Sequence, residues 1–172
     1  MEKLVKKAKK GDNEAFSKLF LIVQKDLYKI ARMRFSSQDD INDAVQETII
    51  HAYSSISSLK NPKYFKSWII RILINECNRL YGLNANSNLE LQEDYYSISN
   101  DAIGNRINEL DFEALINHLN YEERLIITLF YMENLKSKEI ASILNTKDST
   151  VKVKLMRARK KLEKYAKGGI YE

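Results

Sequence analysis

The sequence predicts an all-α protein built from two small helical domains. Apolar residues recur at helical spacing through most of the chain, which favours helices over strands. The 172 residues include only five glycines and one proline, too few for the many turns of a sandwich or barrel. Hydrophobic residues make up 44% of the chain, which is enough apolar material to form a core.

The N-terminal domain is expected over residues 1–81, with three main helices. The apolar stripe that begins Phe16, Leu19, Phe20, Val23 follows the i, i+3, i+4, i+7 spacing and continues to Ala31. Asp12 or Asn13 is placed to cap this helix. A second helix is expected over about 40–55, and a third over 64–81, following a loop that ends at Pro62. On the third helix Trp68 lies with the apolar face, which favours core packing over a wedge between bases.

Residues 82–108 have a different composition and are expected to form a linker. They are rich in Asn and Ser, lack sustained periodicity and carry a net charge of −3. Their acids Glu90, Glu93 and Asp94 suit either a mimic of nucleic-acid charge or a soluble tether, and the composition does not decide between these. A second domain is therefore expected over 109–172.

The sharpest local pattern is a helix-turn-helix near the C-terminus. A helix over about 121–133 is preceded by Asn120, which forms a capping box with Glu123. Ser137 suits the cap of a short helix, and Asn145 tolerates the left-handed backbone of a tight exit. The long helix that follows carries a stripe spaced 4-3-4-3, formed by Val151, Leu155, Ala158, Leu162 and Tyr165. An ordinary αα-hairpin with a charged face would show the same spacing.

Basic residues concentrate on this last helix. Lys147 to Lys167 contain nine lysines and arginines against two acids, which suits a polyanion partner or a solvated helix end. If the helix enters the major groove, Lys152 and Arg157 project from the apolar stripe towards base edges, together with Val153 and Met156. Arg157 suits bidentate pairing with guanine. Three further basic residues of this helix suit phosphate contacts, namely Lys154, Arg159 and Lys160.

Several classes of protein are excluded by what the sequence lacks. His51 and His118 lie in unrelated helical contexts, Cys77 has no nearby histidine, and no glycine-rich phosphate loop occurs. We therefore expect no catalytic residue, no metal and no cofactor, with Cys77 as a small buried side chain. No run of about 18 apolar residues and no secretion signal is found, so a soluble cytoplasmic protein without membrane insertion is expected.

Two separated sets of motifs resemble bacterial sigma factors of the sigma-70 family, of the small extracytoplasmic-function (ECF) type. Residues 11–16 (GDNEAF), 40–48 (DINDAVQET) and 65–75 (FKSWIIRILIN) are similar to region 2. Residues 119–124 (LNYEER) and 150–159 (TVKVKLMRAR) are similar to region 4. Their order and spacing match the two-domain members of the family.

The resemblance implies a non-enzymatic factor that binds core RNA polymerase, directs it to the −35 and −10 promoter elements and helps to open the DNA. It implies contact with the β′ clamp helices and the β flap of the polymerase, with promoter DNA and with an anti-sigma factor. The residues implied to bind the core polymerase are Asp40, Asp43, Gln46 and Glu47. On the residues alone, Asp43 and Glu47 equally suit a solvated helix face.

The same resemblance implies two sets of DNA contacts. Those of the −35 element are Ser149, Thr150, Lys152, Val153, Lys154, Met156, Arg157 and Arg159. Those of the −10 element and DNA melting are Asn61, Lys63, Tyr64, Lys66, Arg71, Asn75 and Asn78. Lysines there suit phosphates, while Tyr64 suits stacking on an exposed base.

Two other functions also fit these features. One is a stand-alone helix-turn-helix regulator of transcription that uses residues 1–81 for dimerisation or sensing. The other is a helical adaptor that binds only protein. A regulator would bind a duplex operator in the absence of polymerase, whereas an adaptor would bind neither.

Overall fold

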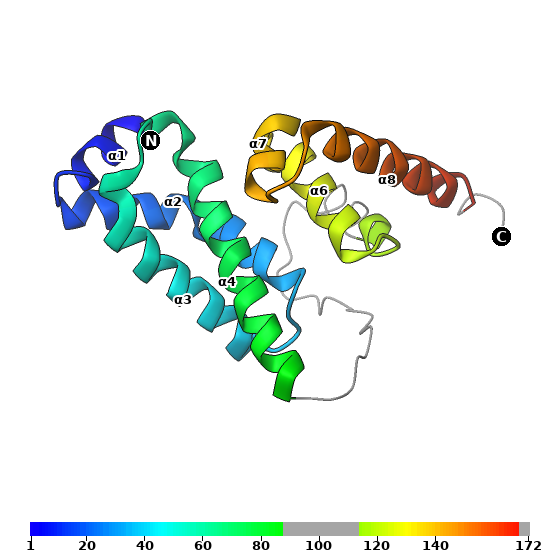
Figure 1. Ribbon diagram of the computed structural model, residues 1–172, viewed down its shortest axis with the longest axis horizontal. Helices are drawn as coiled ribbons and strands as arrows, with labels where there is room; N and C mark the ends of the chain where they lie inside the picture. Colours follow the sequence, from blue (N-terminus) through cyan, green and yellow to red (C-terminus); the bar gives the residue numbers. More distant parts are fainter. Residues whose placement is uncertain (88–113, 169–172) are drawn as a thin grey trace, which may run out of the picture. The chain divides into compact units, whose positions relative to one another are not determined.

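The computed structural model describes residues 1–87 and 114–168, which belong to two compact units (Figure 1). Within these ranges every regular element is a helix, as the periodicity predicted. The described part of the chain contains no helix with the length and apolarity needed to cross a bilayer.

The first unit has three long helices that pack on one another and a short helix at its start. The helices and 3₁₀ turns of this unit are α1 (Glu2–Ala8), α2 (Asn13–Arg32), α3 (Gln38–Ser55), η1 (Ile56–Ser58), η2 (Pro62–Tyr64) and α4 (Phe65–Ser87). α3 packs along α4, and α2 contacts both, while α1 lies against α2 and η2. Fully buried side chains such as Leu27, Phe65 and Leu73 form the core.

Side-chain caps set where the elements of the first unit begin. Asp12 Oδ1 accepts from Ala15 N at 2.9 Å and starts α2, as the sequence predicted. Ser37 Oγ accepts from Asp40 N at 3.4 Å, so α3 begins at Gln38, slightly before the expected start at residue 40. Part of the loop expected before Pro62 is regular, because η1 follows α3 directly.

The sequence analysis did not predict α1. This helix has seven residues, of which only Val5 and Ala8 are buried, so it shows too little apolar periodicity to be recognised. It is held by tertiary contact, since Lys9 Nζ, just after it, donates to the carbonyl oxygen of Leu59 at 2.5 Å. This bond ties the start of the chain to the loop before η2.

α4 continues past residue 81, where the third helix and the first domain were expected to end. It runs to Ser87, so residues 82–87 of the expected linker 82–108 are helical. Gly82 does not stop the helix because glycine inside a helix costs only about 1 kcal/mol relative to alanine. Residues 88–108 of that linker, including Glu90, Glu93 and Asp94, lie outside the described residues.

In the described part of the second unit, α6 (Tyr121–Tyr131), α7 (Ser137–Ile143) and α8 (Asp148–Gly168) each contact the other two, and residues 114–116 before them are also helical. The predicted capping box is present, with Asn120 Oδ1 accepting from Glu123 N at 2.9 Å. The expected cap at Ser137 is wrong by one residue: Lys136 is the N-cap, and its N–H is bound by Glu139 Oε2 at 3.0 Å. The capping interaction therefore comes from a side chain inside the helix.

The turn between α7 and α8 has the geometry that its asparagine predicted. Asn145 has φ +49°, the left-handed conformation that ends a helix tightly. The next residue, Thr146, donates from its N–H to Ala141 O at 2.9 Å and closes the turn. α8 then begins at Asp148.

Candidate nucleic-acid and polymerase interfaces

α8 buries one face and exposes the opposite one. Val151, Leu155, Ala158 and Leu162 of the predicted stripe are buried, whereas Tyr165 is 44% exposed and stacks on His118 with ring centroids 4.3 Å apart. With 3.6 residues per turn, the line opposite this stripe has Val153 at its centre. The same outward line also contains Ser149, Met156, Arg157, Lys160 and Lys164, all exposed.

Two of the expected DNA-contact lysines lie on the flanks of that line and are ion-paired. Lys152 Nζ lies 2.7 Å from Asp148 Oδ2, and Lys154 Nζ lies 2.6 Å from Glu122 Oε2. The hydrogen bond from Lys152 is the main reason why the pKa of Asp148 lies below its usual value. Such exposed pairs contribute little to stability and exchange partners easily, so both lysines remain suitable for phosphate contact.

Arg159 lies on the flank of α8 that faces α6. Its guanidinium carbon is 5.3 Å from the ring centroid of Phe130 and 5.4 Å from that of Tyr131, both on α6. Thr150 is half-buried beside the outward line. The structure thus gathers Ser149, Val153, Met156 and Arg157 on one exposed surface and places the other predicted −35 residues around its edges.

α8 is held against α6 by a charged contact. Lys161 Nζ lies 2.7 Å from Glu123 Oε1, and the Glu123 side chain, which also caps α6, is only 10% exposed. One carboxylate therefore serves both the start of α6 and the orientation of α8. This contact sets the direction in which the outward line of α8 points.

α4 exposes a polar line of its own. Arg71, Asn75 and Asn78 are exposed at spacings of four and three, so they lie on one side of the helix. The structure therefore brings together these three predicted −10 residues. Trp68 precedes them on the same side and is half-buried, with its ring centroid 5.9 Å from that of Phe65.

The loop before α4 presents the remaining predicted −10 residues. Asn61 caps η2 by accepting from Lys63 N at 3.0 Å, while Lys63 and the ring of Tyr64 are exposed. Lys66 lies apart from them: its Nζ is 3.0 Å from Asp26 Oδ2 on α2. Four residues of this set, Asn61, Lys63, Tyr64 and Lys66, thus surround the start of α4, but Lys66 points towards α2.

The outward face of α3 is acidic. Asp43 and Gln46 are exposed, Asp40 and Glu47 are half-buried, and all four share the side opposite the buried Ile41. The apolar side chain of Ile50, 58% exposed, extends the same face by one turn. An acidic face with an apolar side chain at its end suits a basic helical protein partner.

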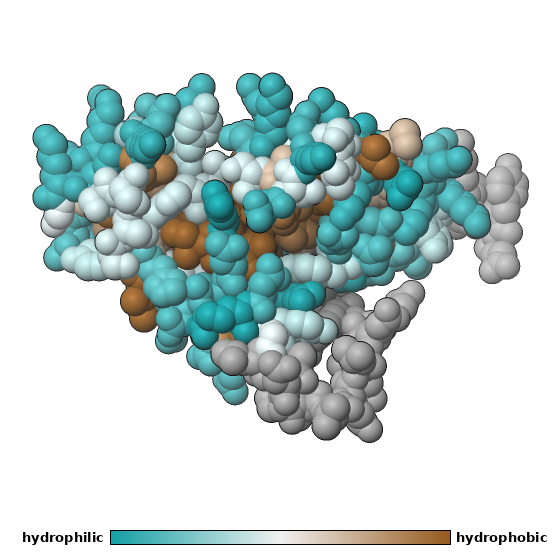
Figure 2. Space-filling view, in the orientation of Figure 1, coloured by the Kyte–Doolittle hydropathy of each residue, from teal (hydrophilic) through white to brown (hydrophobic). Residues whose placement is uncertain are grey.

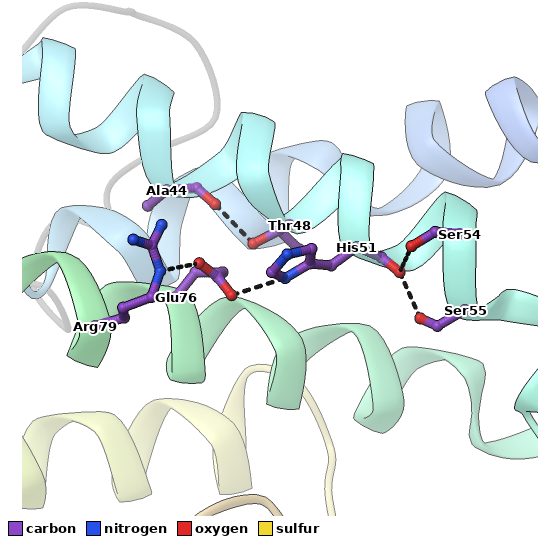
Figure 3. Close-up of polar contacts among 7 residues, drawn as sticks. All are labelled: Ala44, Thr48, His51, Ser54, Ser55, Glu76 and Arg79. Carbon is purple, nitrogen blue, oxygen red and sulfur yellow. Dashed lines mark hydrogen bonds and ion pairs between the residues drawn. The ribbon is translucent and has the colours of Figure 1, made fainter.

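A buried carboxylate joins this helix to α4 (Figure 3). Glu76 Oε1 lies 2.8 Å from His51 Nδ1 on α3, and Glu76 Oε2 lies 2.8 Å from Arg79 Nε. The pKa of Arg79 is raised above its usual value, mainly by this hydrogen bond to Glu76. Sequence reasoning missed this cluster because His51 and Glu76 are on different helices, and no local spacing relates them. It also missed Lys164, which the spacing from Val153 could have placed on the outward line of α8.

These features define an all-helical protein, within the described residues, with a helix-turn-helix and a separate helical unit that carries polar faces. Residues 19–83 match the model of Sigma-70 region 2, and residues 109–162 match that of Sigma-70, region 4. The chain belongs to the sigma-70 family and is an RNA polymerase sigma factor of the ECF type. This family consists of transcription initiation factors that are not catalysts. Matches to both regions in one chain do not favour a stand-alone regulator.

Relatives and solved structures agree with this family. The chain is 31% identical over 138 residues to RNA polymerase sigma factor SigV of Bacillus subtilis, covering 80% of this chain and 82% of SigV. It is 29% identical over 179 residues to the ECF RNA polymerase sigma-E factor of Haemophilus influenzae, covering 93% and 92%. Its fold is similar to RpoE from Bartonella quintana, solved with the anti-sigma factor NepR (TM-score 0.71, 24% identity, 88% and 96% covered). It is also similar to CnrH, solved with the cytosolic domain of CnrY (TM-score 0.68, 22% identity, 97% of each chain covered).

Proposed function

We propose that the outward line of α8 reads the −35 element while α4 and η2 contact the −10 element and the DNA that opens there. The observation that carries this proposal is the outward line itself, where Arg157 and Lys160 stand exposed on the side opposite the buried stripe. The second helix of a helix-turn-helix enters the major groove with its N-terminal residues towards base edges. In the described part of the second unit, Arg157 has no ion-pair partner, so its fork is available for guanine.

The polar line of α4 supports the second contact. Amides at Asn75 and Asn78 suit hydrogen bonds to exposed base edges, and Arg71 suits a phosphate beside them. The exposed ring of Tyr64 offers a stacking surface, and stacking contributes about 1–3 kcal/mol per base. We also assign Asn61, Lys63 and Lys66, around η2, to the −10 contact. Lys66 would exchange its ion-pair partner Asp26 for a phosphate when DNA binds.

The acidic face of α3 is our proposed docking site for the core polymerase. Asp40, Asp43, Gln46 and Glu47 would contact the β′ clamp helices, and the second unit would contact the β flap. An anti-sigma protein is a further proposed partner, because RpoE was solved in complex with the anti-sigma factor NepR. These roles place the protein with RNA polymerase in the cytoplasm.

Site-specific photo-crosslinking in the reconstituted holoenzyme tests the two DNA contacts together. A crosslinker at position 160 on α8 should label the −35 element, and one at position 78 on α4 should label DNA near the start site. A crosslinker at Leu21, an exposed position of α2 outside both lines, is the matched control and should label neither. The proposal would be contradicted if positions 160 and 78 labelled the same promoter element, or if neither labelled promoter DNA.

A further inference from the structure

The outward line of α8 contains two exposed apolar side chains in a basic setting. Val153 is 42% exposed and Met156 is 62% exposed. Lys152, Lys154, Arg157 and Lys160 surround them along the helix. Figure 2 shows a small apolar area over α8 within a hydrophilic surface. The two side chains are neighbours on the proposed DNA-facing line, so a partner that enters there would cover apolar surface as well as charge.

The position of Val153 indicates what kind of group that partner presents. Val153 lies directly opposite the buried stripe, while Lys152 and Lys154 lie on either side of it. In a major groove the flanking lysines would meet the phosphates of the two walls, and the central line would face the base edges. The apolar group exposed on those edges is the 5-methyl group of thymine.

We infer that Val153 and Met156 read thymine methyl groups in the −35 element, an inference that rests on the proposed entry of α8 into that groove. The two residues are three apart, which corresponds to a rise of about 4.5 Å along the helix, close to the spacing of about 3.4 Å between base pairs. For a helix that follows the groove, this rise places the two methyl groups on neighbouring base pairs. Around the helix axis, Arg157 lies on the other side of Val153 from Met156.

The surrounding cations favour DNA over a protein as the partner. Four basic side chains around two apolar ones complement a polyanion that also displays methyl groups. A protein partner covering the same area would have to be acidic. If the partner were an acidic surface of the polymerase, the Val153 and Met156 variants would bind core polymerase more weakly in the absence of DNA.

Replacing single thymines of the −35 element by deoxyuracil tests the inference, because uracil lacks only the methyl group. The affinity of the wild-type holoenzyme for the promoter should fall about fourfold at each of two neighbouring positions, as expected for one buried methyl group. Val153→Ala should abolish this sensitivity at one position and Met156→Ala at the other. Leu21→Ala removes an apolar side chain on α2 that is as exposed as Met156, and it should retain both sensitivities.

Three results would overturn the inference. They are insensitivity to uracil at every thymine of the element, full sensitivity in both alanine variants, and loss of core-polymerase binding in those variants. Arg157→Ala separates these results from a failure of the proposed function. If Arg157→Ala weakens use of the −35 element while uracil has no effect, only the methyl inference fails; if neither has an effect, α8 does not read this element.

Discussion

His51 Nδ1 lies 2.8 Å from Glu76 Oε1, so a single buried carboxylate links α3 to α4 (Figure 3). The Glu76 side chain is 7% exposed, and its second oxygen binds Arg79 one turn further along α4. α3 bears the proposed polymerase face, and α4 bears the proposed −10 line, with Asn75 next to Glu76 in sequence. The contact therefore fixes the two functional helices relative to each other.

Removing this carboxylate should destabilise the first unit. Glu76→Ala deletes two charge-assisted hydrogen bonds at a buried position, and we expect the free energy of unfolding to fall by about 1–3 kcal/mol. Urea unfolding followed by circular dichroism measures the loss. Glu14→Ala, which removes the exposed Glu14–Lys18 pair, is the control and should leave stability unchanged. Equal stabilities of the two variants would show that the buried link is not structural.

The outward line of α8 leads to a prediction about promoter use. Arg157→Ala should weaken use of the −35 element by about 1–3 kcal/mol if its guanidinium pairs with guanine, and Lys152→Ala should do the same if it is base-directed. If Lys152 contacts phosphate from its place on the flank, its replacement instead weakens binding to all sequences alike and lowers the salt dependence. Binding of the holoenzyme to wild-type and −35-mutated promoters, over a range of salt concentrations, separates these two cases. Unchanged promoter selection in both variants would remove the assignment of this helix face.

The left-handed turn before α8 leads to a prediction about stability. Asn145 has φ +49°, which residues with a β-carbon adopt at a cost of about 1–2 kcal/mol, with asparagine among the more tolerant. Asn145→Val should lower the thermal stability of the full chain, whereas Asn145→Gly should preserve or raise it. Differential scanning calorimetry measures both. A valine variant as stable as the glycine variant would mean that the turn tolerates a right-handed backbone.

Cys77 leads to a prediction about reactivity and pH. Burial raises the pKa of its thiol from 9.0 to about 12. The native thiol should therefore resist iodoacetamide at pH 8 and react only after unfolding in urea. The matched control is an exposed thiol at position 142, introduced in a Cys77→Ala background, which should react in the native state.

The direction of this pKa shift also sets the pH dependence of stability. The pKa of the Cys77 thiol is higher in the folded state than in the unfolded state. The contribution of the protonated thiol to the free energy of unfolding is therefore complete below about pH 9 and is lost as the pH rises towards 12. The stability difference between wild type and Cys77→Ala should shrink over that interval. A difference that is constant with pH would contradict the buried, protonated thiol.

The elements with long apolar stripes could be predicted from the sequence, and those held by distant contacts could not. α2 has seven buried residues at helical spacing behind the Asp12 cap, so its pattern defines it locally. α1 has two buried residues and depends on contact with α2 and on the bond from Lys9 to Leu59, which no local pattern encodes. The end of α4 was placed too early because residues 82–108 lack sustained periodicity, although the helix continues to Ser87.

The same distinction applies to the proposed sites. Periodicity places Arg71, Asn75 and Asn78 on one face, because side chains of one helix share a single geometry. It does not reveal that Lys66 pairs with Asp26 or that Arg159 packs on Phe130, because these contacts join different helices. Nor does it reveal Glu76, whose two partners are identified only once α3 and α4 lie together.

Run-off transcription with purified core RNA polymerase on genomic fragments tests the central claim most directly. Wild-type protein should bind the core, give discrete transcripts from specific promoters and bind free duplex DNA weakly on its own. An Arg157→Ala variant should bind the core normally but lose the transcripts that depend on the −35 element. A protein that shifts a duplex operator at physiological salt and has no effect on core polymerase would contradict the account.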